Sequence, residues 1–431
     1  MKRVLLDSLG CAFAADGLDP SCRIVADVFA QPVSAGACTI FSTGGRTSAM
    51  NAALVNGALV HALNFDPIGT ESGHTGVACM AASFALAEER GSSGKDLLVA
   101  SIVAAEVSAR ITCVIAAAGR HPSDKFLAGQ LLSYFGAAAG CGRILNLDAQ
   151  QMESALCLAL MQMSGSRQVI FAGDPPAKSI YGAFPAQGGV TSALLARNGI
   201  DARCDLFGPP AGLYPAIYNA ELNTAGIADN LFHDYKFIDV EFKPWPASNQ
   251  VIPFIDAALE ATRTLRDLGA VDEVVLIGNP RASPWLEPLE FKLAPANIAA
   301  AANSAPYCVA AALVAGRFDL AFVDPVQNSP DLRDIAGKFR VLYDAKQFGV
   351  QIIIRTHGGD SHVFAVETPL GHPSRPLSDA QHLAKFAQCC ELSRNKSVHR
   401  NCKEIAAAFM NLEDVRSVAD ITRLIGCNAS S

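Results

Sequence analysis

Charged side chains are scarce in this chain of 431 residues: Asp, Glu, Lys and Arg make up 17%, whereas half of the residues are hydrophobic. A chain of this length and composition can bury one very large core or two ordinary ones, and two domains are the more common outcome. The formal net charge is −7, and the basic residues form no cluster. Because phosphate binding needs clustered cations, the composition argues against nucleic acid and favours small molecules as partners.

Cysteine is plentiful, at 13 residues, but cysteines at metal-ligand spacing are missing. The sequence contains no CxxC and no pair spaced with histidine as in zinc or iron–sulfur sites, so we expect no metal. The scattered, odd-numbered set predicts small buried hydrophobic side chains in a reducing compartment, which favours the cytoplasm. The adjacent Cys389 and Cys390 leave a redox role open as a lesser alternative.

Uninterrupted apolar runs are also missing. The first fifteen residues imitate a secretory signal, but Asp7 breaks the run, and we predict an amphipathic helix that begins abruptly, as though the chain started partway into its first domain. Residues 97–118 are long enough to span a membrane, yet Glu106 and Arg110 lie four apart and can pair on one helix face. We therefore predict a buried core helix there and no membrane partner.

The hydrophobic period changes once along the chain. Up to about residue 230 the sequence is rich in alanine, with apolar residues at helical spacing. From about residue 235 the period becomes two, and the residues become β-branched, before helical spacing returns near the C-terminus. We predict a mainly α protein with a helical domain over 1–234, an α+β domain over 235–375 and C-terminal helices over 376–431 that return to the helical domain.

Strands are predicted at three places in the middle of the chain: 235–242, 271–278 and 350–368. The last segment contains THGGDS between two apolar runs, which predicts a hairpin. Gly358 and Gly359 can supply the positive φ angles that such a turn requires.

Titratable residues are concentrated in HALNFDPIGTESGHTG, residues 61–76. The helix before it should end near Asn64, because a proline and a glycine follow. The loop then carries Asp66, Glu71 and His74 before the next helix starts, and catalytic groups often lie on such loops. A structural interpretation stays open, in which the aspartate caps a helix and the first histidine is satisfied in the core.

A series of motifs, in order along nearly the whole chain, resembles the MmgE/PrpD family, which includes 2-methylcitrate dehydratases, cis-aconitate decarboxylases and iminodisuccinate epimerases. The motifs are NGALVHALNFD (56–66), GHTG (73–76), ALAEERGSSGKDLLVASIVAAEVSARI (85–111), RHP (120–122), FGAAAGCGRILNLDAQQ (135–151), ALMQMSGSRQ (159–168), AKSIYGAFPAQGGVTSALLARNGI (177–200), FKPWP (242–246) and NSAPYCVAAALVAG (303–316). Their shared order makes the resemblance more specific than any single motif.

The resemblance implies a large helical domain with a smaller α+β lid domain, a homodimer, a site in the cleft between the domains, and no metal or organic cofactor. It also implies a small di- or tricarboxylate substrate that is eliminated, decarboxylated or epimerised. Such chemistry needs a base for a weakly acidic proton and cations or donors for the carboxylate charge that builds up.

The resemblance also assigns roles to particular residues. The catalytic candidates are His74, His121, Asp66, Lys178 and Tyr307, with the two histidines as acid/base groups and Lys178 as the partner of a substrate carboxylate. The substrate-binding candidates are Asn64, Arg167, Lys243 and Ser248; Arg167 can clamp a carboxylate with two hydrogen bonds, and Lys243 and Tyr307 would close the site from the lid. Without the resemblance, His121 reads as a surface residue, Lys243 as a strand-end charge and Tyr307 as core.

Two departures from the family pattern affect the predicted activity. Asn64 stands where the family commonly has the first of two acidic residues, and the segment after FKPWP lacks the histidine that is common there, with Ser248, Asn249 and Ile252 nearby. These departures bear on the decarboxylase and 2-methylcitrate dehydratase activities in particular. A lyase on a small polycarboxylate is the favoured hypothesis, and two others stay open. One is an isomerase or epimerase that uses the same proton abstraction, and the other is an inactive member with a binding role.

Overall fold

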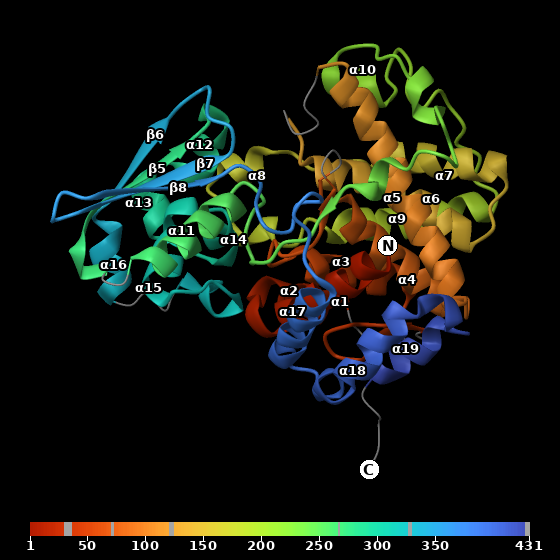
Figure 1. The fold of residues 1–431 in the computed structure, drawn as a ribbon. Coiled ribbons are helices and arrows are strands. Elements are labelled where there is room, and N and C mark those ends of the chain that lie inside the picture. The colour runs from red at the N-terminus through yellow and green to blue at the C-terminus, as the bar shows by residue number, and fades with distance from the viewer. Residues whose placement is uncertain (30–36, 70–72, 120–124, 266–267, 326–329, 427–431) are drawn as a thin grey trace.

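A computed structural model of the chain describes residues 1–29, 37–69, 73–119, 125–265, 268–325 and 330–426. Helices dominate it, as the sequence predicts (Figure 1). We call residues 245–366 the α+β part and the remaining described residues the helical part. Most buried hydrophobic residues of the two parts fall into separate clusters, but Ile298, Leu320 and Val323 of the α+β part join the main cluster of the helical part. The predicted domain bounds 1–234, 235–375 and 376–431 remain predictions.

Small residues let the helices of the helical part pack closely. A Cβ atom on Gly57 would lie 2.6 Å from the carbonyl oxygen of Gly182, and one on Gly189 would lie 2.3 Å from the Cβ of Ala137. Only glycine fits at these crossings. The helices of this part are α1 (Lys2–Leu18), α2 (Pro20–Phe29), α3 (Ala49–His61), α4 (Thr75–Glu89), α5 (Gly94–Ala117), α6 (Ala128–Ile144), α7 (Ala149–Gln162), α8 (Gln168–Phe171), α9 (Ala183–Arg197), α10 (Leu213–Tyr218), α17 (Asp379–Leu392), α18 (Lys396–Met410) and α19 (Val418–Ile425).

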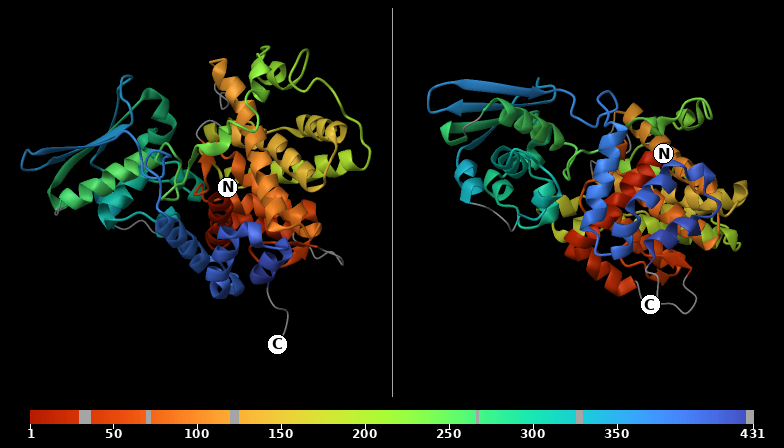
Figure 2. Two further views of the ribbon diagram at one scale, coloured as in Figure 1. Left: turned by 45° about the vertical axis from the view of Figure 1, so that its right-hand side comes forward. Right: turned by 60° about the horizontal axis from the view of Figure 1, so that its bottom comes forward.

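The two ends of the chain pack together. Helix α17 lies beside α1, and α18 also contacts α1 (Figure 2). Helix α1 is consequently buried on all sides from Val4 to Asp16. The prediction of an amphipathic helix was therefore wrong: between Val4 and Asp16 the polar side chains are buried like the apolar ones, and the charge of Asp7 is paired with Lys385 at 2.8 Å.

Helix α5 is the core helix predicted over residues 97–118. Among the described residues it is the one helix long and apolar enough to cross a membrane, and 67% of its most apolar window is buried within the protein. Arg110 Nε donates to Glu106 at 2.7 Å, which confirms the predicted pair. Glu106 also accepts hydrogen bonds from the amides of Lys236 and Phe237, both at 3.0 Å. The pair thus fixes a distant segment against the helix.

That contact explains why a predicted strand is wrong. Residues 235–242 form a 3-10 turn at Lys236–Ile238 and only the short strand β4 (Val240–Glu241). The amides that a longer strand would need are bonded to Glu106 instead. Strand β4 pairs with β3 (Ile68–Gly69), in the loop after α3, and a second short pair joins β1 (Cys38–Thr39) to β2 (Arg46–Thr47).

The α+β part is built on a four-stranded sheet in the order β6-β5-β7-β8. Strand β5 (Val271–Gly278) runs parallel to β6 (Phe339–Tyr343) and antiparallel to β7 (Val350–Thr356), which pairs with β8 (Ser361–Val366) in the predicted hairpin. Strand β6 was not predicted. In the turn, Gly359 alone of the two glycines has a positive φ, of 88°.

Helices cover one face of this sheet (Figure 1). Helix α11 contacts both β7 and β8, and its buried side chains join those of the inner sheet face in one hydrophobic cluster. The helices of this part are α11 (Ile252–Thr264), α12 (Ser283–Leu286), α13 (Leu289–Leu293), α14 (Ile298–Ala302), α15 (Ala305–Ala315) and α16 (Pro330–Ala336).

Candidate active site

One buried carboxylate holds two histidine rings. Asp66 is fully buried just after α3. Its Oδ1 lies 3.1 Å from Nδ1 of His61, and its Oδ2 accepts from Nδ1 of His74. An ionised carboxylate can only accept, so both rings carry their proton on Nδ1. In a neutral ring held in this way, the Nε2 atom keeps its lone pair, as a general base requires.

Asp66, His61 and His74 form a triad, in which burial and neighbouring charges shift the pKa values of Asp66 and His74. Burial alone would raise the pKa of Asp66, but the neighbouring His74 and His61 hold it well below its usual value of 3.8. Burial lowers the pKa of His74 to about 4, against the pull of Asp66, and the positive charge of Lys243 lowers it further. Near neutral pH the cluster therefore holds a carboxylate and an unprotonated His74.

His74 lies where the starts of two helices meet. It is the N-cap residue of α4, and Gly73 before it has a positive φ of 67°. A Cβ atom on Gly129, in the first turn of α6, would lie 3.1 Å from the Cβ of His74. Glycine thus lets the α6 backbone approach the histidine. Helix N-termini carry partial positive charge and free amides, which favour a bound anion.

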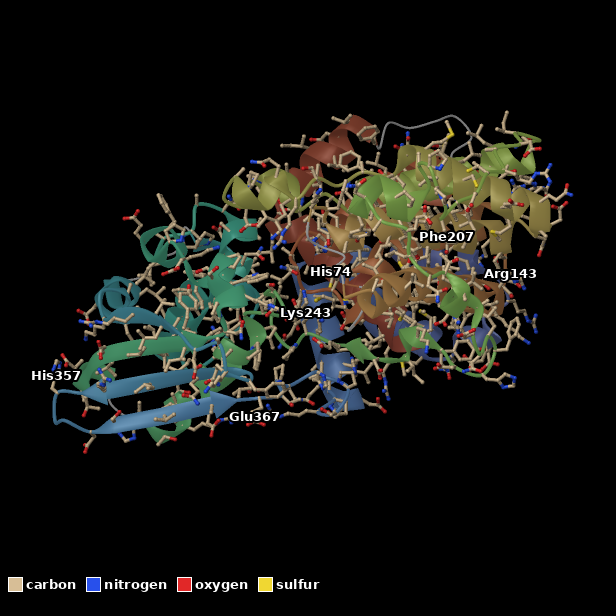
Figure 3. The ribbon with its side chains drawn as sticks, turned by 90° about the horizontal axis from the view of Figure 1, so that it is seen from above. His74, Arg143, Phe207, Lys243, His357 and Glu367 are labelled. Atoms are coloured by element: carbon tan, nitrogen blue, oxygen red, sulfur yellow. The ribbon has the colours of Figure 1, made fainter. Side chains whose placement is uncertain are left out.

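Lys243 and Asn64 are brought together beside this triad. Asn64 has a positive φ of 50°, which asparagine tolerates better than most residues. The Lys243 ammonium donates to both the backbone and the side-chain oxygen of Asn64, at 2.7 and 2.6 Å. Burial lowers the pKa of Lys243 to about 8. Figure 3 shows His74 and Lys243 near the centre of the molecule, where the helical and α+β parts meet.

A second buried lysine braces the same loop from the C-terminal helices. The Lys385 ammonium on α17 donates to Asp7 and to the carbonyl of Phe65, both at 2.8 Å, and to the carbonyl of Lys243 at 3.0 Å. It also lies 3.7 Å from the centre of the Phe65 ring. Lys385 therefore fixes the backbone on both sides of the Lys243–Asn64 contact.

A separate cationic group joins the two parts of the chain. Lys178 pairs with the buried Asp174 at 2.8 Å, and Lys292 from α13 approaches the other oxygen of Asp174 at 3.9 Å. Burial lowers the pKa values of both lysines, and the positive charge of Arg167 lowers that of Lys178 further. The structure thus brings Lys178, a predicted carboxylate partner, together with Lys292 at Asp174, and the charge of Arg167 acts on Lys178.

The NSAPY motif supports Lys292. The Lys292 ammonium donates to the carbonyl of Asn303 at 3.0 Å, and the Ser304 hydroxyl donates to the Lys292 carbonyl. Tyr307 itself is turned into the α+β part, where its hydroxyl donates to the carbonyl of Phe322 at 2.9 Å. Among the described residues, its hydroxyl makes no contact with the triad.

Of two further predicted residues, the structure describes only Ser248. Ser248 is buried, and its backbone amide donates to the carbonyl of Ala302 at 2.8 Å, which ties the segment after FKPWP to the end of α14. His121 lies outside the described residues, as does Glu71.

The triad also consists of metal-ligand residue types. One ligand atom each from His61, Asp66 and His74 lies within 4.8 Å of the others. Both Nδ1 atoms face carboxylate oxygens as hydrogen-bond donors, so neither Nδ1 offers a lone pair to a metal, and only the Nε2 atoms keep one. The metal independence expected from the sequence remains a prediction.

Family models cover most of the chain. The model of the MmgE/PrpD N-terminal domain matches residues 1–224, and the model of the MmgE/PrpD C-terminal domain matches residues 245–411. The chain belongs to the MmgE/PrpD family.

Several curated MmgE/PrpD relatives are enzymes named for one activity. The chain is similar to the cis-aconitate decarboxylase of Homo sapiens, with 25% identity over 98% of this chain and 89% of the relative. The mouse protein of the same name is 24% identical over 98% of the chain and 88% of the relative. The Aspergillus terreus cis-aconitate decarboxylase is 30% identical, over 47% of the chain and 41% of the relative. The family and these names point to an enzyme of the MmgE/PrpD type.

Sequence reasoning about this MmgE/PrpD chain missed several residues that the structure places at the two groups. The sequence suggested His61 only as a core histidine, although its Nδ1 lies 3.1 Å from one of the two carboxylate oxygens of Asp66. Tyr181 lies inside the family motif at 177–200, and its ring centre is 4.0 Å from that of His61. Asp174 and Lys292 lie outside the quoted motifs, so no signal in the sequence marked them.

Proposed function

We propose that this protein is a cofactor-independent lyase, of dehydratase or decarboxylase type, that acts on a small di- or tricarboxylate. The observation that carries the proposal is the Asp66–His74 pair, in which a buried carboxylate fixes a neutral imidazole with its second nitrogen free. The names of the relatives support the reaction class, and the substrate class follows from the cations around the site.

In the proposed mechanism His74 Nε2 moves the proton. In a dehydration, Nε2 takes the proton from the carbon next to a substrate carboxylate, the C–H electron pair forms the new double bond, and hydroxide leaves with its own pair. In a decarboxylation, the C–C bond breaks, carbon dioxide leaves, and the remaining electron pair takes up a proton that Nε2 relays from water. Asp66 holds the ring and stabilises the imidazolium that forms, as the aspartate does in serine hydrolases.

The positive charges would bind the substrate carboxylates. Lys178, Lys292 and Arg167 form one cationic group, and the N-termini of α4 and α6 lie at His74. Because Lys292 comes from the α+β part, we propose that residues 235–375 act as a lid over a substrate that lies between the two parts. A homodimer and a cytoplasmic location complete the proposal.

Exchange of substrate protons in deuterated water tests the function. We would incubate the protein with a panel of small di- and tricarboxylates and follow deuterium incorporation and product by NMR and mass spectrometry. A lyase yields an elimination or decarboxylation product from at least one acid. Exchange without net elimination would mean an isomerase or epimerase instead, and no exchange with any acid would mean an inactive member with a binding role.

A further inference from the structure

Tyr181 lies against the triad from a direction that no assigned residue occupies. It follows Lys178 by one turn, between the 3-10 turn Pro176–Lys178 and α9. The residue is 8% exposed. Its ring centre lies 4.0 Å from that of His61 and 6.4 Å from that of His74. The ring therefore forms one wall of the space around the two histidines.

The position of its hydroxyl follows from Gly129. A Cβ atom built on Gly129 would lie 3.1 Å from the Tyr181 hydroxyl oxygen and 3.1 Å from the Cβ of His74. The position of this Cβ atom is thus close to both side chains, so the Tyr181 hydroxyl lies beside His74 at the N-terminus of α6. The absence of a side chain at Gly129 leaves this position open.

The Tyr181 hydroxyl has no hydrogen-bond partner among the described residues, unlike other buried tyrosine hydroxyls. Tyr214 donates to the carbonyl of Ile111 at 3.2 Å, and Tyr307 to that of Phe322 at 2.9 Å. Tyr134 lies 3.2 Å from the hydroxyl of Ser164. Unlike a fully enclosed atom, the Tyr181 hydroxyl keeps some contact with solvent, so a ligand bound beside His74 can reach it and supply the missing partner.

We propose that Tyr181 is a further catalytic residue, whose hydroxyl donates a hydrogen bond to the carboxylate of the substrate next to the carbon that His74 deprotonates. This inference rests on the proposed function. As the proton leaves that carbon, negative charge grows on the carboxylate oxygens, and a donor already in place stabilises it. No bond to the tyrosine oxygen forms or breaks.

The electrostatics of the site favour a donor. Burial raises the pKa of Tyr181 well above its usual value of 10, and the charge of Asp66 raises it further. The hydroxyl consequently stays protonated throughout the range in which the enzyme would work.

Replacement of Tyr181 by phenylalanine separates catalysis from packing. Tyr181→Phe keeps the ring against His61 and removes only the hydroxyl. We expect kcat to fall by about 10²-fold, as for loss of one donor to a developing oxyanion. We expect KM to change less and Tm to stay the same or rise, since no internal hydrogen bond is lost.

Tyr214→Phe is the matched control. It also removes one buried tyrosine hydroxyl, but that hydroxyl is bonded to Ile111 within the helical part. We expect it to lower Tm and leave kcat unchanged, the reverse of the result for Tyr181→Phe.

Binding provides a readout that does not need turnover. Propane-1,2,3-tricarboxylate serves as an unreactive probe in calorimetry, and we expect Tyr181→Phe to bind it about tenfold more weakly than the wild type, about 1.4 kcal/mol. The controls are a wild type that is active and a His74→Gln variant that is not. Against them, a Tyr181→Phe variant with full kcat, or with unchanged affinity for the probe, overturns the role of Tyr181. The proposed function would still stand. A wild type that neither turns over any acid nor binds the probe overturns both.

Discussion

Replacement of Asp66 by asparagine should stop the chemistry without unfolding the protein. Both carboxylate oxygens accept from Nδ1 atoms, one from His61 and one from His74. The asparagine amide has one oxygen and one NH₂ group, so it can accept from only one ring. The other ring must turn its Nδ1 lone pair to the NH₂ group and carry its proton on Nε2. If that ring is His74, the base is lost.

The expected loss of rate follows from the tautomer. In the serine protease triad the same change, from aspartate to asparagine, lowers kcat by about 10⁴, because the histidine is held in the wrong tautomer. In this triad His61 competes for the amide oxygen, so part of the population keeps the productive tautomer. We therefore expect kcat to fall by about 10²- to 10⁴-fold in Asp66→Asn.

The cost in stability should be smaller and should depend on pH. Loss of charge-assisted hydrogen bonds at one buried group costs about 1–3 kcal/mol, which lowers Tm by a few degrees. Because the folded pKa of Asp66 lies well below 3.8, the carboxylate contributes this stability above that pH. The contribution is lost as the pH falls through the folded pKa, so wild type and variant should converge in acid.

Steady-state kinetics and thermal unfolding of Asp66→Asn provide the assay. Asp16→Asn is the matched control, since Asp16 is also buried and accepts from the amide of Arg394 at 3.0 Å, outside the triad. We expect the control to keep its turnover. Full turnover in folded Asp66→Asn would refute the reasoning about the carboxylate.

Three other predictions follow from the same structure. Since His74 must be neutral to act as the base and its pKa is about 4, kcat/KM should fall as the pH drops through about 4; an acid limb at the ordinary histidine value of 6.5 would contradict this. The Lys243 ammonium holds Asn64 beside the triad and has a pKa of about 8, so kcat/KM should fall again as the pH rises through about 8 and this charge is lost. Chelators should leave activity intact, with less than one equivalent of metal per chain, and activity lost on chelation and restored by zinc or iron would count against the hydrogen-bonded triad. Light scattering at micromolar concentration should show a dimer, and a species of only 45.2 kDa would exclude it.

The helix ends around the site were predictable because residues close by in the sequence decide where a helix ends. A proline and a glycine follow Asn64, and α3 does end at His61, with α4 starting at Thr75 as expected. The buried Glu106–Arg110 pair followed from helical spacing alone. The failure at residues 235–242 has the opposite origin, because Glu106, far away in the sequence, takes the amides that a strand would use.

Several residues of the site are brought together by contacts between distant segments, which the spacing of residues in the sequence does not reveal. The loop put Asp66 and His74 near one another, but only the fold shows that Asp66 also holds His61. Lys178 was predicted as a site residue, whereas Lys292, which approaches the same Asp174 carboxylate from the α+β part, was not. Lys385 joins the loop from the C-terminal helices. Such pairings arise from packing between distant segments, which periodicity and turn signals do not encode.

Replacement of His74 by glutamine is the most direct test of the account, because His74 is the proposed base. We would measure deuterium exchange next to the substrate carboxylate in deuterated water for wild type and His74→Gln, with Tm measured on the same samples. The account predicts that exchange and turnover fall by about 10²- to 10⁴-fold while Tm barely changes. A variant that melts several degrees lower but exchanges at the wild-type rate per folded molecule would show that His74 is structural and would contradict the central claim.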